Sequence, residues 1–123
     1  MARILIIDDD KQIRVALRHL LQSNGHVVEE AINGEEGLAS FQSQPADLVL
    51  LDILMPGISG LEVIGKLQEH TANVSIVTLS SAHKVGRANL LSASVLLGAV
   101  RSLQKPYDPV HLIGVIDELL ATR

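Results

Sequence analysis

The chain has 123 residues, the length of one domain, and 47% of them are hydrophobic, which is enough for a compact core. It has no cysteine, which excludes disulfides and thiol chemistry, and its net charge of −4 argues against direct binding of nucleic acid. No apolar run approaches the roughly 18 residues of a membrane span, and no signal peptide precedes the first apolar run. We therefore expect a single domain over residues 1–123, located in the cytoplasm.

The amino-terminal segment predicts a buried strand followed by an amphipathic helix. Residues 3–7 are an apolar run rich in β-branched side chains, as in a strand that is buried on both faces. From Lys11 the apolar positions change to a helical spacing, with Asp10 as the N-cap and Asn24-Gly25 as the stop. The helical stripe consists of Ile13, Leu17, Leu20 and Leu21.

The next unit begins with a weaker strand and leads to a second buried one. Residues 26–31 are more polar, which suits a strand at the edge of a sheet. Asn33 and Glu36 mark the start of a helix. Its apolar side is assigned to Leu38, Ala39 and Phe41. Residues 48–51 are then unbroken apolar and lead directly to Asp52, which we place at the carboxyl end of a strand buried on both faces.

The second half of the chain repeats the alternation of strand and helix. Ser59 and Glu62 have the spacing of a capping box, and Asp108 followed by Pro109 is a typical helix start. Further strands are expected at 74–79 and 100–104, and further helices from Ser59, over 84–97 and from Pro109. Five β-α units in succession predict an α/β fold with a parallel sheet and helices on both of its faces.

Several polar side chains follow the predicted strands, and in a parallel sheet the carboxyl ends of all strands share one edge. The residues expected there are Asp8, Asp9, Asp52, Ser80 and Lys105. Three carboxylates in one place repel one another unless a cation lies between them. Because the ligands are all oxygens, with no cysteine or histidine, the pattern favours a hard ion such as Mg²⁺ or Mn²⁺.

The same set of groups predicts a site for a phosphoryl group. A metal ion and the Lys105 ammonium can neutralise phosphoryl oxygens, and a serine hydroxyl can donate a hydrogen bond to them. A carboxylate such as Asp52 can attack phosphorus as a nucleophile. In open α/β sheets, ligands lie at this carboxyl edge of the strands.

The chain resembles a known family, the receiver domain of bacterial two-component response regulators. The resemblance extends over the whole length and implies the flavodoxin-like (βα)5 fold, a three-layer sandwich with strand order 2-1-3-4-5. It rests on four motifs in the correct order: Ile6-Ile7-Asp8-Asp9-Asp10, the segment from Asp52 to Gly60, Leu79-Ser80-Ser81-Ala82, and Leu97-Gly98-Ala99 leading to Lys105-Pro106-Tyr107.

The resemblance implies a role for each site residue. Asp52 is expected to be the phosphoacceptor, with Ser80 and Lys105 contacting the phosphoryl group, and the peptide bond before Pro106 is expected to be cis. The metal ligands would be Asp8, Asp9, Asp52 and the backbone carbonyl of Leu54. The implied partners are a sensor histidine kinase or a histidine phosphotransfer protein, together with a downstream effector protein or domain. Neither nucleic acid nor membrane is expected as a direct partner.

Some assignments stay open at the level of sequence. Ser81 is adjacent to Ser80 and is an alternative for the phosphoryl-contacting hydroxyl, and His83 could influence access of water to the acyl phosphate. Ser102 stands where many receivers carry an aromatic residue, which predicts weaker or differently routed coupling to the surface. The segment between Ser80 and Lys105 is somewhat longer than usual. Its leucine-rich helix allows either ordinary core packing or an altered partner surface, including a homodimer through the fourth helix, fifth strand and fifth helix.

Two other functions compete with the receiver interpretation. A phosphatase of the haloacid dehalogenase type would use Asp8 as nucleophile and Asp10 as acid, but Gln12 stands where its motif has threonine. A pseudoreceiver would bind partners without being phosphorylated. The complete set of acidic, hydroxyl and lysine residues argues against the second alternative. The family itself implies a signalling domain that catalyses only its own phosphorylation and dephosphorylation, not an enzyme with an external substrate.

Overall fold

A computed structural model describes residues 2–53, 58–70, 74–81, 101–105 and 107–121. The helix predicted over 84–97, His83, the Leu54 carbonyl and the peptide before Pro106 lie outside these ranges. No helix within the described ranges is both long enough and apolar enough to cross a membrane.

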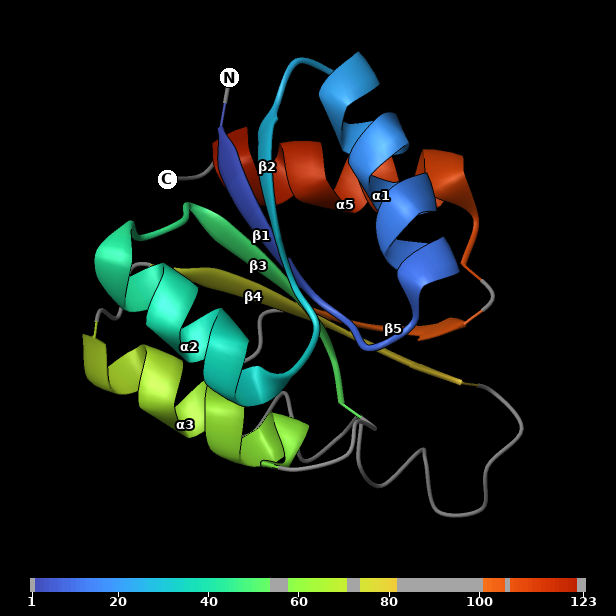
Figure 1. Ribbon diagram of the computed structural model, residues 1–123. Coiled ribbons are helices and arrows are strands. Elements are labelled where there is room, and N and C mark those ends of the chain that lie inside the picture. Colours follow the sequence, from blue (N-terminus) through green and yellow to red (C-terminus); the bar gives the residue numbers. More distant parts are fainter. Residues whose placement is uncertain (1, 54–57, 71–73, 82–100, 106, 122–123) are drawn as a thin grey trace.

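The centre of the molecule is a parallel sheet with strand order β2-β1-β3-β4-β5, as predicted (Figure 1). The strands are β1 (Arg3–Ile7), β2 (Val27–Ala31), β3 (Leu48–Asp52), β4 (Ser75–Ser81) and β5 (Arg101–Lys105). The last two strands extend further than predicted, because Ser80 pairs with Gln104 and Ser81 with Lys105. Ser80 and Lys105 therefore belong to the strands that were expected to end before them.

The described helices cover both faces of the sheet and make the predicted three layers. They are α1 (Lys11–Ser23), α2 (Gly34–Ser43), α3 (Gly60–His70) and α5 (Pro109–Ala121). Figure 1 shows α1 and α5 on one side of the sheet, and α2 and α3 on the other. Each strand turns its alternate side chains toward one of these helix pairs, so both faces of the central strands are buried.

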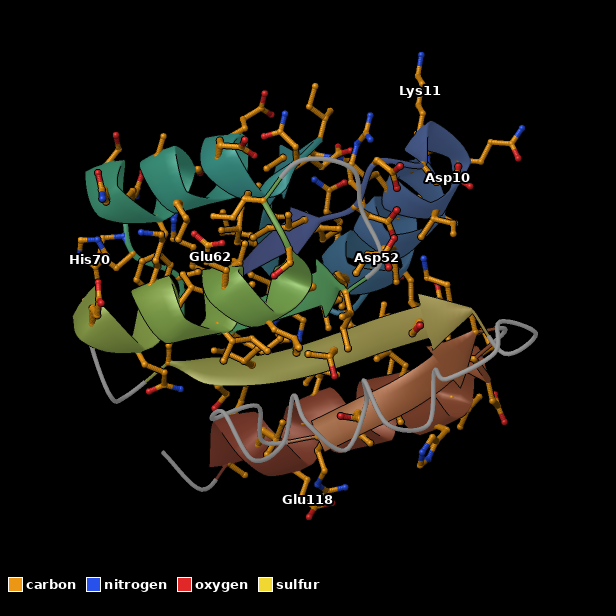
Figure 2. All side chains as sticks on the ribbon, turned by 90° about the horizontal axis from the view of Figure 1, so that it is seen from below. Asp10, Lys11, Asp52, Glu62, His70 and Glu118 are labelled. Carbon is orange, nitrogen blue, oxygen red and sulfur yellow. The ribbon has the colours of Figure 1, made fainter. Side chains whose placement is uncertain are left out.

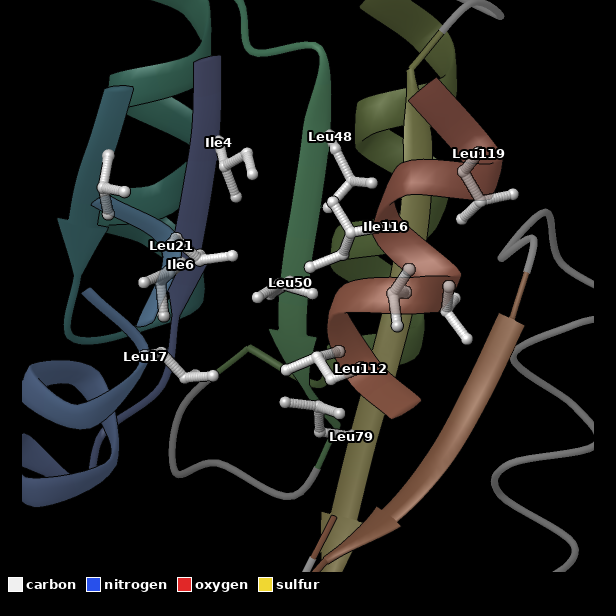
Figure 3. Packing of buried hydrophobic residues seen from close by; sticks show 13 residues of the cluster. Ile4, Ile6, Leu17, Leu21, Leu48, Leu50, Leu79, Leu112, Ile116 and Leu119 are labelled. Atoms are coloured by element: carbon white, nitrogen blue, oxygen red, sulfur yellow. The ribbon is translucent and has the colours of Figure 1, made fainter. Parts of the chain in front are cut away.

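Two aliphatic clusters form the core, one on each face of the sheet. The first joins side chains of β1, β3 and β4 to α1 and α5, and Figure 3 shows Leu50 and Ile116 among its packed residues. The second places Phe41, a fully buried aromatic ring, against β1, β3 and α3. Because β3 lies in the middle of both clusters, every one of its five residues is buried, including Asp52.

The predicted helix caps are confirmed. Asp10 Oδ1 accepts from the backbone N–H of Gln12 at 2.9 Å, and Asn33 Oδ1 accepts from that of Glu36 at 2.8 Å. Ser59 Oγ accepts from Glu62 N at 3.1 Å, and Asp108 Oδ1 from Val110 N at 3.0 Å. These caps satisfy N–H groups that a helix leaves open at its first turn, and they fix where each chain segment leaves the sheet edge. The stop at Asn24-Gly25 is also confirmed, since Gly25 has a φ of 87°.

One part of the predicted helix pattern was wrong. Ala39 is exposed, whereas Gly37 faces the core with Phe41. A Cβ atom on Gly37 would lie 2.4 Å from Ile7 Cδ1, so the glycine lets α2 pack closely against β1. Residues 34, 37 and 41 recur at helical spacing on one face, while position 39 lies off it.

Candidate functional site at the carboxyl edge of the sheet

Three carboxylates gather where β1 and β3 end. Asp8, Asp9 and Asp52 each offer an oxygen atom within 4.8 Å of the others, an arrangement that can hold a metal ion. Asp8 is 1% exposed and Asp52 is 6% exposed, whereas Asp9 is open to solvent. Figure 2 shows Asp52 close to the start of α1, where Asp10 lies, and far from His70 at the end of α3. The cluster therefore combines two buried acids with one accessible acid.

Lys105 brings a positive charge to this cluster from β5. Its Nζ lies 2.9 Å from Asp8 Oδ2 and 3.5 Å from Asp52 Oδ2. Burial alone would lower the pKa of Lys105, but the hydrogen bond to Asp8 and the charges of Asp52 and Asp8 outweigh it and raise the pKa above its ordinary value. The ammonium therefore remains charged while it offsets the repulsion between the acids.

Two hydrogen bonds to neighbouring main-chain groups fix Asp8. Its N–H donates to the carbonyl of Ala31 on β2 at 3.1 Å. Its Oδ1 accepts from the backbone N–H of Asp10 at 2.9 Å, and Asp10 in turn caps α1. The turn that carries the acid pair is thus tied to the edge strand on one side and to the first helix on the other.

Asp52 owes its position to the central strand and to the segment that follows it. The strand register places it beside Leu79 of β4, and Ile53 continues the ladder by donating its N–H to the Leu79 carbonyl at 3.1 Å. Gly60 then lies directly on Ile53, because a Cβ at position 60 would be 2.6 Å from Ile53 Cα. Its N–H donates to the Ile53 carbonyl at 3.3 Å, so the start of α3 holds the strand exit in place.

The hydroxyl groups of β4 differ in their environment. Ser80 is completely buried, and its Oγ has no hydrogen-bond partner among the residues that the structure describes. Two residues earlier on the same face, Thr78 Oγ1 lies 2.9 Å from Ser102 Oγ on β5. Because a buried hydroxyl left without a partner costs free energy, Ser80 Oγ is a candidate for contact with a bound ligand. The side chain of Ser81 lies outside the described part of the chain.

The structure adds a group that sequence reasoning missed. Arg14 Nη1 donates to the backbone carbonyl of Asp8 at 2.8 Å, and its Nε donates to Glu30 Oε1 at 3.2 Å. Glu30 also forms an ion pair with Arg18, one helical turn further along α1. The only signal in the sequence was the pair of arginines four residues apart beside a polar edge strand, which gives no hint of the contact with Asp8.

The donor set fits a hard divalent cation. All three groups are carboxylates, no histidine or cysteine joins them in the described part of the chain, and the nearby ammonium matches an anion that shares the site. The structure brings Lys105 together with the three carboxylates at the sheet edge where the sequence placed them.

Residues 4–117 match the family model of the response regulator receiver domain. The chain belongs to that family. The receiver is the signalling domain of two-component response regulators, which are phosphorylated on an aspartate and act together with histidine kinases and effector domains. The family and the function predicted from the sequence are therefore confirmed. The match gives no support to a haloacid dehalogenase-type phosphatase.

Individual relatives agree with this assignment. The receiver is similar to the transcriptional regulatory protein ResD of Bacillus subtilis, with 31% identity over 96% of this chain and 48% of ResD. It is also similar to the sporulation initiation phosphotransferase F of the same organism, with 30% identity over 86% of this chain and 83% of that protein. The chain thus spans about half the length of ResD but most of the smaller relative.

A solved structure shows the same fold. The CheY-like receiver domain from Methanospirillum hungatei has a TM-score of 0.90 and 29% identity, covering 99% of this chain and 95% of that one. Such agreement confirms the flavodoxin-like arrangement of five parallel strands predicted from the sequence.

Proposed function

We propose that this receiver accepts a phosphoryl group on Asp52, with Asp8, Asp9 and Asp52 holding Mg²⁺ or Mn²⁺ and with Ser80 and Lys105 contacting the phosphoryl oxygens. The observation that carries the proposal is the position of the Lys105 ammonium, 2.9 Å from Asp8 and 3.5 Å from Asp52, beside the three-carboxylate cluster. The backbone carbonyl of Leu54 belongs to the proposed ligand set on family resemblance alone, since it lies outside the described residues.

The chemistry follows from the groups present. An oxygen of Asp52 attacks the phosphorus of a phosphohistidine, the new P–O bond forms as the P–N bond breaks, and the electron pair stays on the imidazole of the donor. A bound divalent cation supplies positive charge for the carboxylates and for the phosphoryl oxygens. Lys105 adds a second positive charge in a partly buried position, where screening by water is weak.

Ser80 is the proposed hydrogen-bond donor to the phosphoryl group. Its hydroxyl is fully buried and lacks a partner among the described residues, so it is free to donate a hydrogen bond to a phosphoryl oxygen. Thr78 lies on the same face of β4 but already bonds Ser102, which makes it a poor alternative. Within the described part of β4, these environments favour Ser80 over Thr78 as the hydroxyl that contacts the phosphoryl group.

The proposed partners follow the family. A sensor histidine kinase or a histidine phosphotransfer protein donates the phosphoryl group, and a downstream effector protein or domain reads the change. One form of output is a homodimer through β5, α5 and the predicted fourth helix, which lies outside the described residues. We further propose that residues 1–123 are one receiver domain, which catalyses only its own phosphorylation and dephosphorylation. The cytoplasmic location expected from the sequence stays a prediction.

Labelling with acetyl phosphate and Mg²⁺, followed by intact-mass measurement, tests the phosphoacceptor. Asp52→Asn should abolish the mass increase, and Asp117→Asn, on the exposed face of α5, should leave it unchanged. Labelling that persists in Asp52→Asn and disappears in Asp8→Asn would support the phosphatase alternative. No labelling of the folded wild-type protein at any Mg²⁺ concentration would support the pseudoreceiver.

A further inference from the structure

Arg14 connects the acid pair to the edge strand through a contact with the main chain. Its side chain is 12% exposed, and its guanidinium donates to the Asp8 carbonyl at 2.8 Å and to Glu30 at 3.2 Å. The rigid, planar donor fork of arginine can satisfy both acceptors at once, which a lysine cannot do in the same way. Arg14 itself stands in the first turns of α1, where its N–H donates to the Asp10 carbonyl at 3.0 Å.

The Asp8 carbonyl matters because it belongs to the peptide that joins the two acids. A peptide group is planar, so fixing its carbonyl oxygen also fixes the N–H and Cα of the next residue, Asp9. Asp8 is held by its buried strand and by Lys105, whereas Asp9 is exposed to solvent. The direction in which the Asp9 carboxylate leaves the backbone therefore depends on the orientation of this peptide.

We propose that Arg14 is a positioning residue for the divalent-cation site. By holding the Asp8 carbonyl, with Glu30 as its anchor, it keeps the Asp8–Asp9 peptide in the orientation that brings the Asp9 carboxylate to Asp8 and Asp52. This inference rests on the proposed function, since it assigns Arg14 a part in the cation binding proposed for the same cluster. Arg14 touches neither the cation nor the phosphoryl group.

A purely electrostatic role and a positioning role of Arg14 predict opposite changes in Mg²⁺ affinity when its guanidinium is removed. A guanidinium close to a cation site repels the cation, so its removal should strengthen Mg²⁺ binding if charge alone decides. Loss of a positioning contact should weaken binding, because the Asp9 carboxylate would sample more orientations. The sign of the change therefore separates the two explanations.

Arg18 provides a matched control on the same helix. It pairs with the same Glu30 carboxylate, and within the described residues it donates to that carboxylate and not to the Asp8 carbonyl. Arg14→Gln and Arg18→Gln thus each remove one positive charge and one of the two ion-pair partners of Glu30. They differ in the hydrogen bond to Asp8.

The experiment is a titration of the metal-free protein with Mg²⁺. Calorimetry measures the affinity, and the amide NMR signals of Asp8 and Asp9 report on the orientation of the peptide between them. Arg14→Gln should weaken Mg²⁺ binding about tenfold, while Arg18→Gln should leave it unchanged or slightly stronger. Acetyl phosphate labelling of Arg14→Gln should be slow at limiting Mg²⁺ and should approach the wild-type rate at saturating Mg²⁺. If Arg14→Gln does not fold, Arg14→Lys replaces it, with weaker binding again expected despite the retained charge.

The outcomes distinguish this inference from the proposed function. Wild-type Mg²⁺ binding with equal or tighter binding in the Arg14 variant overturns the positioning role and leaves the site assignment intact. An equal loss in the Arg14 and Arg18 variants also overturns it, because the effect would then come from Glu30. Absence of Mg²⁺ binding by the wild-type protein would overturn both.

Discussion

Lys105 Nζ lies 2.9 Å from Asp8 Oδ2, although 97 positions of the chain separate the two residues. The bond joins the end of β5 to the end of β1 across β3 and β4, and it places the ammonium nearer to Asp8 than to Asp52. The lysine is thus held beside the acids before any phosphoryl group is present. Because the ammonium offsets the charges of two buried acids, its protonation contributes to the stability of the folded protein.

The first prediction concerns stability at alkaline pH. The pKa of Lys105 is raised, so the folded protein holds this proton more tightly than the unfolded chain, whose lysine has the ordinary value of 10.5. The resulting stabilisation is complete below pH 10.5 and is lost as the pH rises through the higher folded-state pKa. Lys105→Met should therefore lower the free energy of unfolding of the metal-free protein at neutral pH and flatten its decline above pH 10.5.

Urea unfolding followed by circular dichroism, in the presence of a chelator and at several alkaline pH values, measures this effect. Lys66→Met, an exposed position on α3, is the control and should keep the wild-type decline. Burial and the charge of Asp8 also raise the pKa of Tyr107, so part of the decline should remain in Lys105→Met. An unchanged decline in that variant would contradict the prediction.

The second prediction compares two hydroxyls on one face of β4. Ser80→Ala removes a buried hydroxyl that lacks a partner in the described structure, and it should raise the free energy of unfolding by about 1 kcal/mol. Thr78→Val breaks the bond to Ser102 and should lower it by about 1 kcal/mol. Acetyl phosphate labelling should nevertheless be slower in Ser80→Ala, so stability and activity would change in opposite directions. A destabilised Ser80→Ala protein would show that the hydroxyl serves the fold.

The third prediction concerns the contact between Gly60 and Ile53. A Cβ at position 60 would lie 2.6 Å from Ile53 Cα and 2.8 Å from the Ile53 carbonyl oxygen, and neither backbone atom can move without shifting the end of β3. We expect Gly60→Ala to destabilise the protein by about 2 kcal/mol and to slow labelling of the neighbouring Asp52. Chemical denaturation and intact-mass labelling measure the two effects.

Gly65 is the matched control within the same helix. It is exposed, and a Cβ there would meet nothing within 4 Å. Gly65→Ala should therefore stabilise α3 by about 0.5–1 kcal/mol through lower backbone entropy in the unfolded state. Equal effects of the two substitutions would mean that the close approach of α3 to Ile53 has no energetic weight.

The fourth prediction concerns the response of β5 to phosphorylation. Ser102 stands where many receivers have an aromatic ring, and here it bonds Thr78 across the strand pair. Addition of Mg²⁺ and beryllium fluoride, which mimics a phosphoryl group, should change the amide NMR signals of Arg101 and Leu103 less than in receivers with the ring. Ser102→Tyr should enlarge these changes. Shifts in the wild-type protein as large as those of aromatic-bearing receivers would refute the expectation.

Local patterns in the sequence predicted the order of elements and the acids at the sheet edge. The buried run before Asp52 and the caps at Asp10 and Ser59 each depend on residues close together in the chain, and such signals are visible without coordinates. The ends of β4 and β5 were misjudged because hydrogen bonding continues beyond the apolar run, through the pair of Ser81 and Lys105.

Contacts that depend on the path of the backbone could not be predicted in the same way. The bond from Arg14 to the Asp8 carbonyl joins a side chain to a backbone atom, and backbone atoms are the same at every position of a sequence. The close approach of Gly60 to Ile53 depends on the path of the chain between them, and a glycine alone is compatible with many turns. Both features emerge only once helix, strand and turn are placed together.

The dispersal of the site over β1, β3 and β5 has a consequence for biosynthesis. A nascent chain that has reached α3 already carries Asp8, Asp9 and Asp52, yet it lacks the lysine that offsets their repulsion. Closing contacts between segments so far apart in sequence is a slow, late event in folding. We therefore expect the ability to take up a phosphoryl group on Asp52 to arise only when β5 has joined the sheet.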